Sequence, residues 1–306
     1  MTDFTERLAE AVGRCRNPVV VGLDPRWDDL PESLKAEHDG ETLAGRADAY
    51  RQFCRELVDV VAGIVPVVKP QAAFFEQLGP AGMQVLADVI GYSRHRGLLV
   101  ILDGKRNDIG STATAYADGI LGSTSAWGAD ALTVSPYLGD DSLQPFFDVA
   151  AQRAAGIFVL VKTSNPGGRQ FQDLTCEGKP LYRHVADYLE TLAAKAVGAC
   201  GYAGIGAVVG ATYPQQLAEL RAAMAHAWLL VPGYGSQGGT AKDVAPAFDP
   251  CGLGALVNNS RGIIFAYRNP KFAGGLTPGN WQTAIERACR DMIEQLAAET
   301  TTGRLG

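Results

Sequence analysis

The strongest chemical signal in this 306-residue sequence is Leu102-Asp-Gly-Lys-Arg-Asn-Asp, where charges follow directly on an apolar run. Asp103 and Lys105 are two residues apart, so an extended backbone points both side chains to one side. Lys69 ends another apolar run and could join them. Two lysines around a carboxylate could stabilise a developing carbanion and then protonate it. The competing interpretation is a structural ion pair or a set of solvated loop charges.

Asp108 follows in Asn107-Asp-Ile-Gly-Ser, and it has two interpretations. It could cap a helix or lie in its first turn, which is a common structural role for aspartate. Alternatively, it could extend the group to an alternating Lys, Asp, Lys, Asp array. In such an array each charge has a neighbour of opposite sign, and a carboxylate can lie where a substrate anion must leave.

A second group of residues suits a phosphate. The segment Gly233-Tyr-Gly-Ser-Gln237-Gly-Gly follows an apolar run, and Ser260-Arg261 follows the next one. Backbone N–H groups of such loops bind phosphate, and an arginine adds a charge-assisted hydrogen bond. The alternatives are a purely structural turn or the GxGxxG fingerprint of a dinucleotide site. That fingerprint belongs to the first strand-to-helix turn of its fold, and here it comes near the end of the strand series.

These residues all follow short apolar or β-branched runs, which are typical of parallel strands buried on both faces. Eight such runs are present, at Val19–Leu23, Ile64–Lys69, Leu98–Asp103, Ala131–Ser135, Ile157–Lys162, Ile205–Val209, Trp228–Val231 and Ala255–Asn258. Helix-length segments follow them, at Gly45–Val61, Pro80–His95, Ser111–Gly122, Ser142–Arg153, Tyr182–Ala199, Pro214–Ala227, Thr240–Ala247 and Trp281–Glu299.

Eight strand–helix units without a composition break predict an α/β fold, a single (β/α)₈ TIM barrel over residues 1–306. The active site of such a barrel lies at the carboxyl ends of its strands, which is where the charged residues are. We expect a loop-like insertion at 166–180, a surface connection at 268–280 and a C-terminal helix at 281–299.

Composition excludes several classes of protein. With 27 Lys and Arg against 33 Asp and Glu, the net charge is −6, which disfavours binding to nucleic acid or to an anionic membrane. The N-terminus lacks a signal-peptide pattern, and we find no long apolar segment, so we expect a soluble cytoplasmic protein. Six cysteines without CxxC spacing and four histidines predict neither a zinc site nor disulfides.

Taken together, six segments resemble orotidine 5′-phosphate decarboxylase, in its longer bacterial form (the type 2 subfamily). The resemblance extends in order over about residues 16–265, and its most specific part is the DxKxxDIGxT core. The segments are VGLDPR, VVKPQAAFFE, LDGKRNDIGSTA, KTSNPGG, VPGYGSQGG and NNSRGI.

The resemblance implies a role for each matching residue. Lys69, Asp103, Lys105 and Asp108 would form the charged catalytic array, with Lys105 as the proton donor to C6 of the pyrimidine. Asp108 and Thr112 would enter the neighbouring subunit's site in a homodimer. The remaining implied contacts are Asp24 with the ribose hydroxyls, Thr163 with the pyrimidine, and Gln237 and Arg261 with the phosphate, beside Gly233 and Ser260 of the same loops.

The implied reaction is the decarboxylation of orotidine 5′-phosphate to uridine 5′-phosphate (UMP), the last step of pyrimidine (UMP) biosynthesis. Loss of CO₂ leaves a carbanion-like centre at C6, which needs preorganised positive charge. Lys105 meets that need, so we expect no metal and no organic cofactor. The expected small-molecule partner is orotidine 5′-phosphate, with no nucleic acid and no membrane.

Three rival functions stay open at this point. A related metal-dependent sugar-phosphate decarboxylase or synthase would need a carboxylate and water cage for Mg²⁺, with an acidic residue in place of Lys69. A Schiff-base aldolase would use a desolvated lysine, Lys69, Lys105 or Lys162, without flanking carboxylates. A non-catalytic nucleotide-binding barrel would have no need of Lys105 between two carboxylates.

Overall fold

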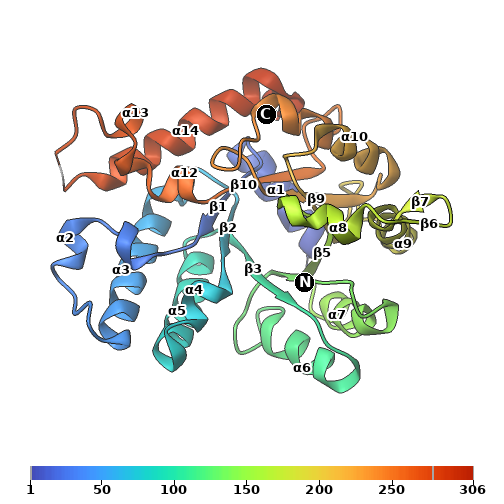
Figure 1. Ribbon diagram of the computed structural model, residues 1–306, viewed down its shortest axis with the longest axis horizontal. Helices are drawn as coiled ribbons and strands as arrows, with labels where there is room; N and C mark the ends of the chain where they lie inside the picture. Colours follow the sequence, from blue (N-terminus) through green and yellow to red (C-terminus); the bar gives the residue numbers. More distant parts are fainter. Residues whose placement is uncertain (1, 278, 306) are drawn as a thin grey trace.

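The computed structural model of the chain describes residues 2–277 and 279–305, and its core is a closed barrel of eight parallel strands (Figure 1). Around the barrel the order is β1-β10-β9-β8-β5-β4-β3-β2, with β1 closing on β2. The strands are β1 Val19–Leu23, β2 Val67–Pro70, β3 Leu99–Arg106, β4 Ala131–Val134, β5 Gly156–Lys162, β8 Ala203–Val209, β9 Ala227–Val231 and β10 Ala255–Asn259. The predicted barrel class and its eight strands are confirmed.

Helices follow the strands and cover the outside of the barrel. The main ones are α3 Leu43–Val61, α5 Gly79–His95, α6 Gly110–Ile120, α7 Asp140–Gln152, α9 Leu181–Ala193, α10 Pro214–Ala223 and α14 Trp281–Glu299. Short helices lie in the connections: α2 Glu32–Lys35, α4 Ala72–Glu76, α8 Arg169–Gln172, α11 Ala241–Val244, α12 Arg261–Ile264 and α13 Pro270–Ala273. Among the described residues, no helix is long and apolar enough to cross a membrane.

Each strand alternates between an outward and an inward side chain. The outward residues pack under the helices, as Val19 and Val21 do. The inward residues form a separate core to which every strand contributes, through Val20, Val67, Ile101, Ala131, Phe158, Val208, Leu230 and Leu256. Two residues further along, the inward positions of β2, β3 and β4 are Lys69, Asp103 and Thr133. The apolar core therefore lies directly beneath the polar residues at the carboxyl ends.

An N-terminal helix, α1 Phe4–Cys15, contributes to the inner core, and the sequence had not predicted it as an element. Phe4 contacts Phe158 edge to face, with ring centroids 6.3 Å apart. A side chain at Gly156 would collide with the Phe4 ring, since a Cβ there would lie 2.2 Å from Phe4 Cδ1. Trp228 Nε1 donates to Thr5 Oγ1 at 2.9 Å, which satisfies the buried indole.

Two predicted helices end four or more residues earlier than the sequence indicated. The helix expected to reach Ala199 ends at Ala193, and turns continue to Gly201, whose φ of +87° favours glycine. The helix expected to reach Ala227 ends at Ala223, because Ala227 already begins β9. Alanine-rich helix ends lack a clear stop signal, so the apolar pattern ran on into the following turns.

The segments expected to be loops contain short regular elements. Residues 166–180 include α8 and a two-stranded hairpin, β6 Thr175–Cys176 and β7 Lys179–Pro180, which lie beside α9 in Figure 1. The connection at 268–280 includes α13.

Candidate active site

A pocket of about 460 Å³ opens at the carboxyl ends of the strands. Its polar residues come from seven strands or the loops that follow them. The pocket lining includes most of the predicted site residues: Asp24, Lys69, Asp103, Lys105, Thr163, Gly233, Gln237, Ser260 and Arg261. Leu160, Val208 and Leu230 provide apolar surface, so the pocket combines an apolar wall with ionised groups.

Asp103 lies between the two lysines. Lys69 Nζ donates to Asp103 Oδ2 at 2.6 Å, and Lys105 Nζ donates to Oδ1 at 2.6 Å. Lys69 and Asp103 are buried, with 5% and 7% of their surface exposed, whereas the Lys105 side chain is 47% exposed. One carboxylate with two ammonium groups leaves a net positive charge, and its more accessible ammonium belongs to Lys105.

The ion pairs set the protonation states of the buried pair. Burial alone would raise the pKa of Asp103, but Lys69 and Lys105 outweigh burial and hold the pKa of this carboxyl well below its usual range. Burial alone would lower the pKa of Lys69, but Asp103 and Asp24 raise it above its ordinary value. Asp103 and Lys69 are therefore both charged at neutral pH.

The backbone at Lys105 is not extended, which corrects the reason given for its orientation. Its φ is +43°, in the left-handed region, and the pairing of β3 with β4 shifts register between Leu102 and Arg106. The Lys105 backbone N–H donates to Thr133 Oγ1 at 2.9 Å, and that hydroxyl donates to Asp103 Oδ1 at 2.9 Å. The two side chains thus converge through a bend that Thr133 stabilises.

Thr133 is a site residue that the sequence analysis missed. It is buried and lines the pocket from β4. The sequence contained a signal for it, namely the alternation of inward positions along the strand. Thr133 lies two residues after the inward Ala131, just as Asp103 lies two residues after the inward Ile101. A hydroxyl at an inward position of a buried strand indicates a hydrogen-bonded partner.

The Asp103→Asn variant should be about 3 kcal/mol less stable than the wild type near neutral pH, because Lys69 would lose its buried carboxylate. The folded-state pKa of Asp103 is depressed, so its stabilisation is complete above its ordinary pKa of about 4 and is lost as pH falls toward the folded value. Urea denaturation should give a difference in the free energy of unfolding between wild type and Asp103→Asn that is constant from about pH 6 to 8. This difference should shrink below about pH 4.

Asp118→Asn provides the control for that measurement, since Asp118 pairs with Arg153 at the surface and should contribute less than about 1 kcal/mol. If the difference in the free energy of unfolding between wild type and Asp103→Asn stayed constant down to about pH 2, this result would contradict the depressed pKa of Asp103.

Asp108 and Thr112 lie outside this pocket; neither is among the described residues that line it. Asp108 Oδ1 accepts from the Ile109 N–H at 2.9 Å, and the N-cap position of α6 is Ile109. The helix-capping interpretation of Asp108 is therefore wrong for this helix. Thr112 is exposed in the first turn of α6. Within one chain, the array contains Lys69, Asp103 and Lys105 without Asp108.

Among the described residues that line this pocket, two polar side chains at the ends of β1 and β10 have buried oxygens without a protein partner. They are Asp24 Oδ1 and Asn258 Oδ1, and both residues line the pocket. Asn258 had not been predicted as a site residue. Buried oxygens of this kind are normally hydrogen-bonded, so these two are available to hydroxyl or amine groups of a ligand.

The glycine-rich loop after β9 folds back on itself. Gly233 has φ +100° and Gly235 has φ +70°, and the Gly239 N–H donates to the Gly233 carbonyl at 3.1 Å. The turn leaves Gln237 exposed at the pocket. Arg261 is also exposed and begins α12, and it borders both this pocket and an adjoining one of about 500 Å³. These groups can bind an anion at the side of the pocket formed by β9 and β10.

Ser260 lies against β1. A Cβ at Gly22 would be 1.8 Å from Ser260 Oγ, so only glycine on β1 leaves room for this serine. Its hydroxyl is within 3.4 Å of Asn258 Nδ2. The close approach of Gly22 and Ser260 positions the chain that continues into Arg261.

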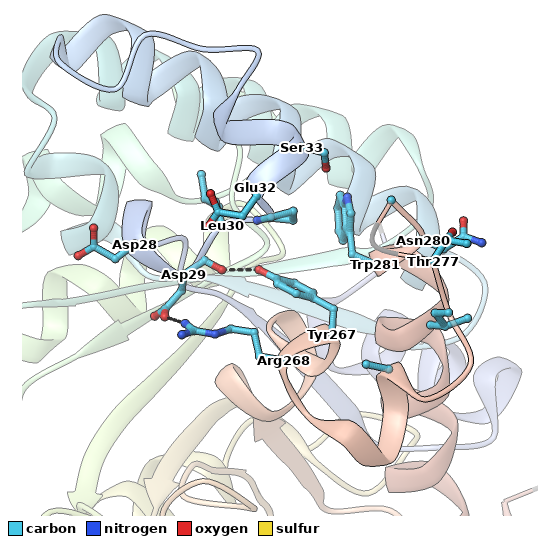
Figure 2. A pocket seen from close by; sticks show the side chains of 14 residues that line it. Asp28, Asp29, Leu30, Glu32, Ser33, Tyr267, Arg268, Thr277, Asn280 and Trp281 are labelled. Atoms are coloured by element: carbon cyan, nitrogen blue, oxygen red, sulfur yellow. Dashed lines mark hydrogen bonds and ion pairs between the residues drawn. The ribbon is translucent and has the colours of Figure 1, made fainter.

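A second pocket, of about 410 Å³, lies between the segment after β1 and the one after β10 (Figure 2). Figure 2 shows Asp29 joined to both Tyr267 and Arg268, through its backbone carbonyl and its carboxylate. None of the buried unpartnered oxygens or nitrogens found among the described residues belongs to its lining. We interpret this pocket as a structural feature, in which the contacts of Asp29 with Tyr267 and Arg268 hold the loop after β1 in place.

The geometry bears on two of the rival functions. All three candidate Schiff-base lysines pair with carboxylates: Lys69 and Lys105 with Asp103, and Lys162 with Asp173. A Schiff-base lysine is desolvated and lacks flanking carboxylates, so this pairing does not fit an aldolase. Strand β2 presents Lys69 where a metal cage would need an acid, and the nearby Glu76 pairs with Arg106. The observed arrangement is suited to stabilising negative charge and donating a proton.

Comparison with known proteins gives a consistent picture. The family model described as "Orotidine 5'-phosphate decarboxylase / HUMPS family" matches residues 17–274. A relative from Rhodopirellula baltica, named orotidine 5′-phosphate decarboxylase, is 56% identical over 97% of this chain and 99% of its own. A relative of the same name from Caldicellulosiruptor saccharolyticus is 39% identical over 88% of this chain and 92% of its own.

A solved structure also resembles the fold. The structure of Leishmania donovani OMP decarboxylase superposes with a TM-score of 0.74 at 33% identity, covering 97% of this chain and 98% of that one. The similarity therefore extends over nearly the whole length of both proteins.

Proposed function

This chain belongs to the orotidine 5′-phosphate decarboxylase / HUMPS family and is a carboxy-lyase that converts orotidine 5′-phosphate to UMP, and we propose that Lys69, Asp103 and Lys105 perform the reaction. The observation that supports these roles is the placement of Asp103 between two ammonium groups, each 2.6 Å away, in the pocket at the strand ends. Positive charge is preorganised there before any substrate binds.

The proposed mechanism begins with the substrate carboxylate next to Asp103. Repulsion between the two carboxylates disfavours the bound ground state, and the C6–CO₂ bond breaks with its electron pair left on C6. The Lys105 ammonium stabilises this carbanion and then transfers a proton to C6, which yields UMP and CO₂. Lys69 keeps Asp103 ionised throughout. These reaction steps require no metal ion and no organic cofactor.

The test is turnover of orotidine 5′-phosphate, followed by the change in ultraviolet absorbance. We expect decarboxylation with and without EDTA. Loss of activity in EDTA, restored by Mg²⁺, would favour the related metal-dependent sugar-phosphate enzymes instead. Binding of UMP without any turnover of orotidine 5′-phosphate would favour the non-catalytic alternative.

The remaining pocket residues divide by position. Asp24 binds the ribose hydroxyls through its unpartnered carboxylate oxygen, and Thr163 contacts the pyrimidine. Gly233, Gln237, Ser260 and Arg261 form the phosphate side. Because the phosphate is remote from C6, its binding energy can offset the cost of desolvating the reacting groups.

Arg261→Ala should mainly raise KM for orotidine 5′-phosphate, because a phosphate contact far from C6 acts on ground and transition states alike. Loss of a charge-assisted hydrogen bond of about 1.5–3 kcal/mol corresponds to an increase of roughly 10- to 150-fold. Steady-state kinetics measure it, with Arg290→Ala as the control, an exposed arginine that pairs with Glu286 within α14. An unchanged KM would place the phosphate elsewhere.

We also propose a homodimer in which Asp108 and Thr112 enter the partner's pocket. Both lie outside their own pocket, on the connection into α6 and in its first turn. Exposed apolar side chains accompany them: Ile109 at 58%, Tyr116, and Tyr137 at 82% with Leu138 after β4. An exposed apolar group of this kind is typical of a protein–protein interface. A cytoplasmic location stays a prediction, as does the absence of nucleic-acid and membrane partners.

A further inference from the structure

The insertion at 166–180 is joined to the barrel by an ion pair between the buried Lys162 and the partly exposed Asp173. Lys162, the last residue of β5, is fully buried, and its Nζ lies 2.5 Å from Asp173 Oδ1. The same ammonium lies 4.7 Å from the centre of the Tyr213 ring. A buried ammonium without a carboxylate would be strongly destabilising, so Asp173 holds the insertion close to the end of β5.

The residue before Asp173 contacts the pocket lining directly. Gln172 Oε1 accepts from the Thr163 backbone N–H at 3.0 Å, and Gln172 Nε2 donates to Thr163 Oγ1 at 2.8 Å. A backbone N–H can only donate, so the amide oxygen of Gln172 must face it and the NH₂ group must face the hydroxyl. The Thr163 hydroxyl is therefore an acceptor toward Gln172, and its own proton is free.

We propose that Gln172 is a positioning residue that makes Thr163 a hydrogen-bond donor to a carbonyl oxygen of the pyrimidine. This inference rests on the proposed function, which places the base beside Thr163. Thr163 lines the pocket, and Gln172 is not among the described residues that do. The insertion thus acts on recognition of the base without touching it.

Packing around the pair leaves it little freedom. A Cβ at Gly168 would lie 2.8 Å from Thr163 Oγ1 and 2.9 Å from Gln172 Oε1. On the other side, Thr212 Oγ1 donates to the Ser164 carbonyl at 3.2 Å. Gly210 also packs closely there, since a Cβ on it would lie 2.7 Å from Ser164 Cα. The segment that carries Thr163 is therefore fixed from both sides.

The experiment compares two ligands by calorimetry, UMP and ribose 5-phosphate, which lacks the base. Gln172→Ala should weaken UMP binding by about 10-fold, the effect of losing one oriented hydrogen bond, and leave ribose 5-phosphate binding unchanged. Gln172→Glu should lose at least as much, because a carboxylate cannot donate and would accept the Thr163 proton. Gln170→Ala, at an exposed glutamine of the same short helix, is the matched control.

A double-mutant cycle separates positioning from general damage to the loop. In a Thr163→Val background, Gln172→Ala should cause no further loss of UMP affinity, because its effect passes through the hydroxyl. Equal losses for both ligands, or an undiminished effect in the Thr163→Val background, would overturn the inference. Turnover of orotidine 5′-phosphate by the wild type is measured alongside. Absence of this turnover would overturn the proposed function. Normal turnover by the wild type together with unchanged UMP binding in Gln172→Ala would contradict this inference alone.

Discussion

The Lys105→Ala variant should fold as the wild type does and lose nearly all decarboxylation. We expect the turnover number to fall by at least about 10⁴-fold, because the substitution removes both the charge that stabilises the carbanion and the proton that quenches it. Stability should change little, since the Lys105 side chain is half exposed and Asp103 keeps its bonds to Lys69 and Thr133. Single-turnover kinetics and thermal denaturation measure the two effects.

Two companion variants sharpen the interpretation. Lys105→Arg keeps a positive charge but cannot give up a proton readily, so any activity it retains over Lys105→Ala reports the electrostatic contribution. Lys242→Ala removes an exposed lysine whose nearest carboxylate, Glu299, is 3.8 Å away, and it should leave the rate unchanged. Comparable activity in Lys105→Ala and the wild type would end the assignment of Lys105 as proton donor.

Mixing two inactive variants, Lys69→Ala and Asp108→Ala, should restore activity. If Asp108 acts in the partner's pocket, one site of each mixed dimer receives both lesions and the other receives neither. With random exchange at equal amounts, half of the dimers are mixed and half of their sites are intact, so activity should approach about a quarter of wild type. The value follows from counting sites, and the assay is turnover after demonstrated subunit exchange.

The matched control is a mixture of Lys69→Ala and Lys105→Ala. Both residues line the pocket of their own chain, so each site of a mixed dimer keeps one lesion and no activity should return. If Lys69→Ala is poorly folded, Lys69→Met replaces it, since a neutral side chain of similar length better fills the buried space. Failure of the Lys69 and Asp108 mixture to recover, with exchange shown, would contradict the shared site.

The sequence by itself was sufficient for the barrel and for most of the pocket. Parallel strands buried on both faces have a continuous apolar pattern, and the closed barrel brings their carboxyl ends to one mouth. Residues at those ends, such as Asp24, Lys69 and Asp103, therefore converge whatever the details of the loops. The alternation of inward and outward side chains along β4 would also have identified Thr133, but only charged residues were selected at the inward positions.

Other features depended on contacts that no local pattern encodes. The left-handed backbone at Lys105 follows from its bond to Thr133, 28 residues further along the chain. The position of Asp108 outside its own pocket follows from the path of β3 into α6. The two hydrogen bonds between Gln172 and Thr163 form because the Lys162–Asp173 ion pair holds the insertion against the end of β5. Periodicity reports which face of an element is buried, but hydrogen bonds between loops form only once the barrel has closed and fixed their ends in space.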